Sequence, residues 1–240
     1  MDFAATHWSL VRRAGGASVE TRRLCLDILL PRYLPALRAH LTIDKRIPAG
    51  QADDLLQGFI ADKVVEQNLV ALADPAKGKF RSFLLAALNR YVIDQLRRDA
   101  SARRGGQSQH TTEKSAADSA VSRESPPSQQ FDVVWARELV GQALRLMREE
   151  CEQTGRQDIW EIFQFRIVRP AFDGIEPMPY ELLIERFELG SPFHAYNLLT
   201  TGKRMFARLL RSAAGEYASD EAAIDEEISD LKSVLAGIGG

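Results

Sequence analysis

The sequence has few of the residues that build metal clusters, disulfide frameworks or catalytic triads. Its 240 residues include two cysteines, Cys25 and Cys151, and four histidines. Two cysteines so far apart form no metal cluster and do not indicate a disulfide framework. We expect both to be buried free thiols. Neither a glycine-rich phosphate loop nor an HExxH motif occurs, and the scattered histidines give no triad. The sequence therefore predicts a protein that is not an enzyme, with no catalytic residue, no metal and no cofactor.

Long apolar runs are lacking too. The longest are short and interrupted by charge, so no membrane span is expected. Residues 1–8 contain no basic segment followed by an apolar core, so no signal peptide is indicated. Apolar residues make up 45% of the chain and charged residues 27%, which is ordinary for a globular protein. These features predict a cytoplasmic location.

The charges are distributed unevenly along the chain. The formal net charge is −2, which argues against a general polyanion binder. Residues 77–104, however, contain eight Lys or Arg against two acids, and residues 216–240 contain seven acids against one Lys. A basic middle and an acidic tail cancel in the total while leaving one strongly positive face.

Strand signals are also missing, because no stretch alternates convincingly and no hairpin turn separates apolar runs. The sequence therefore predicts an all-α fold of two small helical domains joined by a flexible linker. The predicted divisions are a first domain at 1–100, a linker at 101–130 that is poor in large apolar residues, a second domain at 131–215 and an acidic tail at 216–240. Helical periodicity predicts a first helix over 20–30, which is broken or kinked by Pro31 and Pro35 and resumes through 41. Another predicted helix begins at 53, and the others cover 78–98, 131–147, 159–165, 180–187 and 192–210.

The segment from Gly78 to Arg98 is the most informative one. It follows turn chemistry at 74–78, and its apolar residues recur at helical spacing. The predicted apolar stripe consists of Phe80, Phe83, Leu84, Ala87, Leu88, Tyr91, Val92 and Leu96. The predicted polar face consists of Lys79, Arg81, Asn89, Arg90, Asp94, Arg97 and Arg98. From periodicity alone, this polar face is either a solvated surface or a face suited to nucleic acid.

This segment resembles the extracytoplasmic function group of sigma-70-family RNA polymerase sigma factors. The similarity lies in Gly78-Lys79-Phe80-Arg81 and in the later Asn89, Asp94 and Arg97-Arg98. The upstream segment 51–57, Gln-Ala-Asp-Asp-Leu-Leu-Gln, is similar to an acidic signature of the same family. The resemblance is stronger over residues 8–100 than over 131–215. It implies a region 2 helical bundle followed by a region 4 helix-turn-helix.

The resemblance implies a role for each motif of the first domain. The acidic signature would dock on the clamp helices of the polymerase β′ subunit, through Asp53, Asp54 and Gln57. Asp53 is also placed to cap or flank a helix N-terminus, and both roles are kept. The basic segment would open and read the promoter −10 element, which requires cations along the backbone and faces for unstacked bases. The residues implied for the −10 element are Lys79, Arg81, Asn89, Arg90, Arg97 and Arg98. Tyr91 is more compatible with the core.

In the second domain, residues 180–187, a Gly-containing turn and residues 191–199 resemble the region 4 helix-turn-helix. The N-terminal part of such a recognition helix reads base edges in the major groove, and nearby basic residues hold phosphates. The residues implied for the −35 element are His194, Tyr196, Asn197, Thr200 and Thr201 for bases, with Lys203, Arg204, Arg208 and Arg211 for phosphates. A solvated surface histidine is the alternative for His194.

Three functions remain open from the sequence. The leading one is a sigma factor whose partners are core RNA polymerase, through the β′ clamp helices and the β flap, and promoter DNA. The second is a helix-turn-helix regulator that does not bind polymerase. The third is an interaction module whose acidic tail controls access to the basic face. The tail places Ile224, Ile228, Leu231 and Leu235 at helical spacing, so an amphipathic helix is expected. A separate anti-sigma factor or a Ser/Thr kinase is a further possible partner by resemblance, and no membrane contact is expected.

Overall fold

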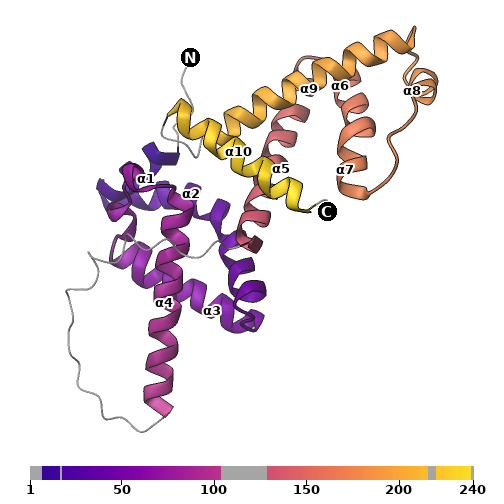
Figure 1. Ribbon diagram of the computed structural model, residues 1–240. Helices are drawn as coiled ribbons and strands as arrows, with labels where there is room; N and C mark the ends of the chain where they lie inside the picture. Colours follow the sequence, from indigo (N-terminus) through magenta and orange to yellow (C-terminus); the bar gives the residue numbers. More distant parts are fainter. Residues whose placement is uncertain (1–6, 17, 104–128, 216–219, 239–240) are drawn as a thin grey trace. The chain divides into compact units, whose positions relative to one another are not determined.

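The computed structural model describes residues 7–16, 18–103, 129–215 and 220–238, and every regular element within these ranges is a helix. The predicted all-α fold is therefore confirmed. The contacts divide the chain into two compact units, which are described separately (Figure 1). Unit 1 comprises Met1–Ala136 with Gly215–Gly240, and unit 2 comprises Arg137–Ala214. The C-terminal helix thus belongs to unit 1, whereas the sequence set 216–240 apart as a tail. Most of the predicted linker, residues 104–128, lies outside the described residues.

Unit 1 is built from α-helices, π-helical turns and 3-10 turns. Its α-helices are α1 (His7–Gly16), α2 (Val19–Ala39), α3 (Ala49–Phe59), α4 (Phe80–Arg103), the start of α5 (Gln129–Gln153) and α10 (Glu221–Ile238). Two π-helical turns, η1 (His40–Asp44) and η2 (Ile60–Glu66), extend α2 and α3, and the 3-10 turns η3 (Leu69–Leu72) and η4 (Pro75–Lys77) precede α4. Helix α1 packs on α2 and η3, and α3 packs on α2 and α4.

Aromatic side chains form the centre of unit 1. The Phe80 ring, in the first turn of α4, meets the rings of Trp8 and Tyr33 edge-on at centroid distances of 6.0 and 5.5 Å. Further along α4, Tyr91 meets Phe59 of α3 at 5.8 Å. Edge-to-face pairs of this kind add to the free energy gained by burying the rings. The predicted position of Tyr91 in the core is confirmed, since its side chain is buried.

Helix α2 runs without a break through Pro31 and Pro35, so of the predicted break or kink, the break is wrong. Proline removes one backbone donor and usually disrupts a helix interior. Here the two prolines are four residues apart on the exposed side of α2, where water can satisfy the freed carbonyl groups. The opposite side buries Tyr33, Ala36 and Leu37, and this packing holds the helix together.

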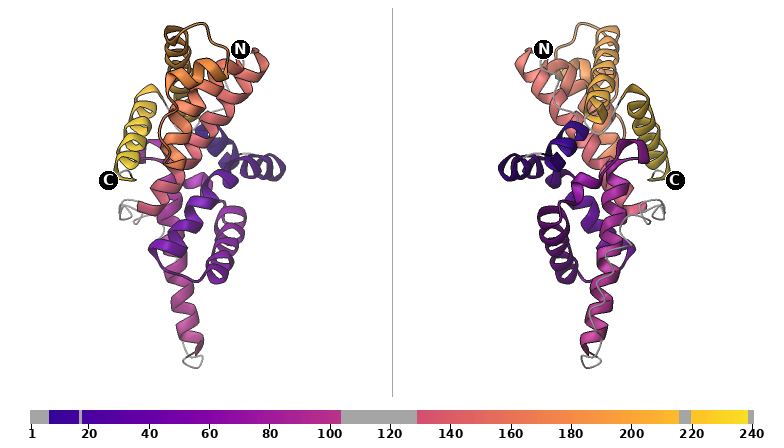
Figure 2. Two further views of the ribbon diagram at one scale, coloured as in Figure 1. Left: turned by 90° about the vertical axis from the view of Figure 1, so that its right-hand side faces the viewer. Right: turned by 90° about the vertical axis from the view of Figure 1, so that its left-hand side faces the viewer.

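The turn before α4 follows the sequence prediction. The side chain of Asp74 accepts a hydrogen bond from the Ala76 backbone amide at 3.0 Å, and Gly78 has a φ of 121°, which favours glycine. Helix α4 then continues to Arg103, and its C-terminal part runs beyond the other helices of unit 1 (Figure 1, Figure 2). Leu96, predicted for the apolar stripe, is instead 46% exposed there, because no helix covers this part of α4.

Unit 2 contains the rest of α5, α6 (Gln157–Phe163), the π-helical turn η5 (Gln164–Val168), α7 (Arg169–Asp173), α8 (Tyr180–Arg186) and α9 (Pro192–Gly215), whose last residue belongs to unit 1. Its core joins Met147 and Cys151 of α5 to Ile162 and Phe163 of α6 and to Leu199 of α9. The predicted pair of helices around the turn at 187–191 is confirmed as α8 and α9. Both cysteines of the chain are free and buried, as expected.

Among the described residues, no helix combines the length and apolar character needed to cross a membrane.

Two glycines of α3 provide a test of the packing of α3 against α4. A Cβ atom on Gly58 would clash with the Tyr91 hydroxyl oxygen, whereas a Cβ on Gly50 would have no neighbour within 4 Å. We expect Gly58→Ala to lower the free energy of unfolding by about 1–3 kcal/mol, because Tyr91 must move and lose its hydrogen bond to Asp62. Gly50→Ala should be neutral or stabilising by up to about 1 kcal/mol. Urea unfolding measures both variants, and equal effects would contradict this packing.

Candidate nucleic-acid interface

Arg81 lies on the buried side of α4, so its predicted place on a polar face is wrong. Its side chain is 8% exposed. Arg81, Leu85, Leu88 and Val92 recur at the spacing i, i+4, i+7 and i+11, which aligns side chains along one side of a helix, and all four residues are buried. Helical spacing aligns Arg81 with these apolar residues, whereas the sequence prediction assigned it to the polar face. The predicted basic face is thus not a single surface.

The buried guanidinium of Arg81 is neutralised by α10. Its Nη1 donates to both carboxylate oxygens of Glu227 at 2.8 and 2.7 Å, and its Nη2 donates to Asp230 at 2.6 Å. Lys79, just before α4, donates to the same Asp230 oxygen at 2.6 Å and lies 3.1 Å from Glu226. Two of the six residues implied for the −10 element therefore bind the acidic C-terminal helix.

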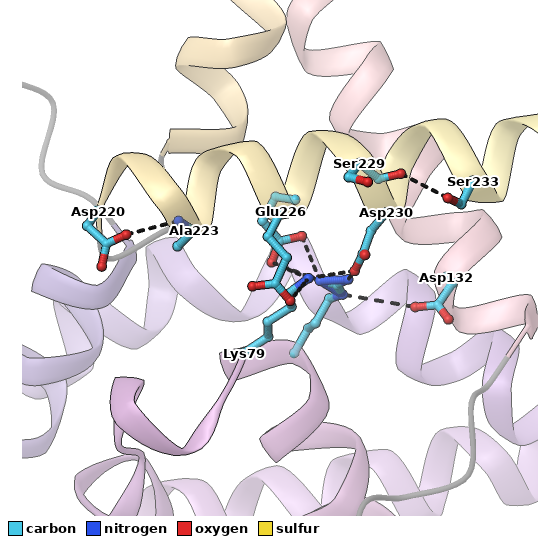
Figure 3. Close-up of polar contacts among 10 residues, drawn as sticks. Lys79, Asp132, Asp220, Ala223, Glu226, Ser229, Asp230 and Ser233 are labelled. Atoms are coloured by element: carbon cyan, nitrogen blue, oxygen red, sulfur yellow. Dashed lines mark hydrogen bonds and ion pairs between the residues drawn. The ribbon is translucent and has the colours of Figure 1, made fainter.

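The start of α5 completes the surroundings of Arg81. The guanidinium carbon lies 4.1 Å from the centroid of the Trp135 ring, a cation–π geometry. Asp132, one turn earlier on α5, lies 4.0 Å from the Arg81 Nε (Figure 3). Arg81 therefore connects α4, α5 and α10 through a single side chain.

The carboxyl groups of this cluster differ in their pKa. Burial raises the pKa of Glu227, and the positive charges of Arg81 and Lys79 oppose this shift. Burial also acts to raise the pKa of Asp230, but the hydrogen bonds and charges of Lys79 and Arg81 outweigh it, so its pKa lies below the ordinary value. Asp230 is consequently the more firmly ionised partner, and Glu227 incurs the larger desolvation cost.

Asn89, implied as a base reader, is engaged inside unit 1. The ring of His40 is buried, with Nε2 2.9 Å from the Asn89 Oδ1 and Nδ1 2.9 Å from the Asp44 Oδ2. His40 and Asp44 are the first and last residues of η1, the π-helical turn that ends α2. The Asn89 oxygen therefore helps to hold η1 against α4.

The remaining arginines implied for the −10 element lie from the middle of α4 to near its end. Arg90 is half-buried, and Arg97 and Arg98 are exposed on the part that runs beyond the other helices. Two large apolar side chains of the same part, Ile93 and Leu96, are 49% and 46% exposed. An exposed helix end with arginines and apolar side chains can hold phosphates and also contact unstacked bases.

The acidic signature lies on α3, which begins at Ala49, so the predicted N-cap role of Asp53 is wrong. The residue preceding the helix is Pro48, five residues before Asp53. Asp53 instead accepts two hydrogen bonds from Arg38 of α2, at 2.6 and 3.1 Å, and these bonds lower its pKa. Asp54 and Gln57, three residues apart, are both exposed. They share the solvent-facing side of α3.

Helix α9 of unit 2 presents its first half to solvent. Among the residues implied for the −35 element, only Thr200 is half-buried. The exposed ones include His194, Tyr196, Asn197, Thr201, Lys203 and Arg204. Ala195, Leu198 and Leu199 form the buried side of the same helix. The two threonine hydroxyls donate to backbone carbonyls one turn earlier, both at 2.9 Å.

Two further contacts of unit 2 involve arginines. Arg208, implied as a phosphate contact, binds both carboxylate oxygens of Glu150 at 2.6 and 2.7 Å. Arg166 donates to the Met178 carbonyl at 2.8 Å and lies 4.4 Å above the Tyr180 ring. Arg166 thereby fixes the chain segment that precedes α8. The sequence did not single out this residue.

The cluster around Arg81 also contains residues that sequence reasoning missed, namely Trp135, Glu227 and Asp132. The opposite charges of residues 77–104 and 216–240 were the only signal for it.

The described residues contain no group of three or more histidine, cysteine, aspartate or glutamate side chains that is suited to hold a metal ion. Comparison of the chain with protein-family models, with curated proteins and with solved structures finds no match.

The structure predicts a large cost for removing Arg81 alone. Arg81→Ala leaves Glu227 buried, with Lys79 at 4.0 Å as its nearest cation, so we expect the free energy of unfolding to fall by about 3 kcal/mol or more. The double variant Arg81→Met/Glu227→Leu removes both buried charges and should recover most of this loss. Arg97→Ala, an exposed control, should change stability by less than about 0.5 kcal/mol. Urea unfolding followed by tryptophan fluorescence compares the three, and a double variant that loses as much as Arg81→Ala would contradict the role of the pair.

Proposed function

We propose that this chain is a sigma factor of RNA polymerase: it binds core polymerase, recognises a promoter and helps to open it. The observation that carries the proposal most is that the resembling segment forms one long helix, α4, with Arg97 and Arg98 exposed at its far end. The same unit exposes Asp54 and Gln57 on α3. On this proposal, the exposed side of α3 serves polymerase and the far end of α4 serves DNA.

Unit 2 supports the proposal independently. Helices α8 and α9 flank a short turn in which Glu188 has a φ of 51° and Leu189 is buried. Such a turn holds the second helix at an angle to the first and leaves its N-terminal residues open to the major groove. Asn197 is suited to adenine, and Lys203 and Arg204 are suited to phosphates. These features support promoter recognition by α9.

The same α8–α9 pair also favours a second candidate, a helix-turn-helix regulator that binds DNA without polymerase. The two candidates differ in one requirement, because only a sigma factor needs the exposed face of α3 for core polymerase. Capture of core polymerase by variants of α3 therefore separates the two candidates.

The double variant Asp54→Ala/Gln57→Ala should weaken capture of core RNA polymerase by tenfold or more, about 1.4 kcal/mol, because it removes the exposed polar pair of α3. Asp53→Ala should weaken it less, since the Asp53 carboxylate already binds Arg38. Asp27→Ala, exposed on α2, is the matched acidic control. If the unmodified chain does not capture core polymerase, or if all three variants behave alike, polymerase binding through α3 is disproved.

In α9, Lys203→Ala should weaken DNA binding similarly for all sequences and reduce the slope of log affinity against log salt by about 1. Asn197→Ala should instead reduce discrimination at one base position by about 1–3 kcal/mol. Selection from a random DNA pool, followed by salt titration, measures both effects. Ser212→Ala, exposed near the end of α9, is the control. Loss of base preference in Lys203→Ala alone would contradict this assignment.

A further inference from the structure

Helix α10 forms several ion pairs with Lys79 and Arg81. Its fully buried side chains are Glu227 and Leu231, while Ile224 and Ile228 are only half-buried and Leu235 is 41% exposed. One large apolar residue is therefore buried completely, against three carboxylates that contact Lys79 or Arg81. A helix held in this way is displaced more readily by another polyanion than one held by a large apolar face.

The cations beneath α10 form an organised anion site. The Arg81 guanidinium is fixed by its stacking on Trp135, and it directs two nitrogens toward α10. Lys79 points at the same carboxylate from the turn before α4 (Figure 3). Arginine binds carboxylate and phosphate with the same forked geometry, so the α10 carboxylates occupy positions that phosphate oxygens can also occupy.

The charges along the chain are consistent with competition between α10 and a nucleic acid for Lys79 and Arg81. Helix α10 and its cap contain six acids, namely Asp220, Glu221, Asp225, Glu226, Glu227 and Asp230, against Lys232. A nucleic-acid backbone is likewise a row of closely spaced negative charges. The same pair of cations therefore suits both ligands, and it cannot hold both at once.

We propose that Lys79 and Arg81 form a phosphate-binding site for single-stranded nucleic acid and that α10 is its built-in competitor. Nucleic acid binds this site when α10 leaves it, and docking of α10 closes the site. The identity of the ligand rests on the proposed function, whereas the competition rests on the contacts of α10 alone. Because coupling between two ligands is reciprocal, bound nucleic acid must loosen α10 by the same factor by which α10 weakens nucleic acid.

The first test compares two charge-matched variants of the full chain. Asp230→Asn removes the carboxylate that binds both Lys79 and Arg81, and Asp225→Asn removes an exposed carboxylate of the same helix. The probe is a fluorescein-labelled oligothymidylate of about 20 nucleotides, at about 50 mM salt, where phosphate contacts are strong. We expect Asp230→Asn to bind it at least about fivefold more tightly than Asp225→Asn. Equal affinities, or no binding by either variant, would overturn the proposal.

The second test needs no substitution. Hydrogen exchange of α10 is measured on the unmodified chain with and without the saturating oligothymidylate. We expect the amides of residues 221–238 to exchange faster when the oligonucleotide is bound, while those of Phe59 and Leu88 in the core stay protected. Unchanged protection of α10 in the bound protein would overturn the proposal.

Failure of this inference is distinguishable from failure of the proposed function. A chain that captures core polymerase but shows no difference between the two aspartate variants remains a candidate sigma factor without the α10 competition. A chain that shows the difference but captures no core polymerase retains the competition and loses the sigma-factor assignment.

Discussion

The buried guanidinium of Arg81 is the interaction on which the arrangement of unit 1 depends. A charge so far from water is tolerated only when its surroundings neutralise it and satisfy its donors. Glu227 and Asp230 supply the opposite charge, and the Trp135 ring supplies a face for stacking. Three helices that are distant in the sequence are thereby tied to one side chain. Removing Arg81 or Glu227 alone leaves the other charge buried without its main counterion.

The consequence for function is that the residues implied for the −10 element fall into separate groups. Lys79 and Arg81 bind α10, Asn89 binds His40 inside the unit, and the exposed arginines Arg97 and Arg98 stand at the free end of the helix. On the proposed function, the free end makes the first contact with DNA. The pair under α10 then adds phosphate contacts only after that helix has moved.

The sequence was sufficient for the helical class, for most helices and for the turn from Asp74 to Gly78, because periodicity and turn chemistry are local signals. It failed where contacts between residues far apart in the sequence determine the position of a side chain. Arg38, which engages Asp53, and Glu227, which engages Arg81, are 15 and 146 residues away from their partners. The prediction of a helix break at the prolines of α2 failed for a related reason, since burial of Tyr33 and Leu37 outweighs the local preference to end the helix. No local pattern reveals such pairings.

The central claim, that the chain directs polymerase to promoters, is tested most directly by run-off transcription. Purified core RNA polymerase is incubated with a genomic template pool, with and without the full chain, and the 5′ ends of the transcripts are mapped. The account predicts discrete start sites that appear only with the chain and share sequence elements about 10 and 35 base pairs upstream, about one and three and a half turns of the duplex away. Transcripts that are the same with and without the chain would contradict it.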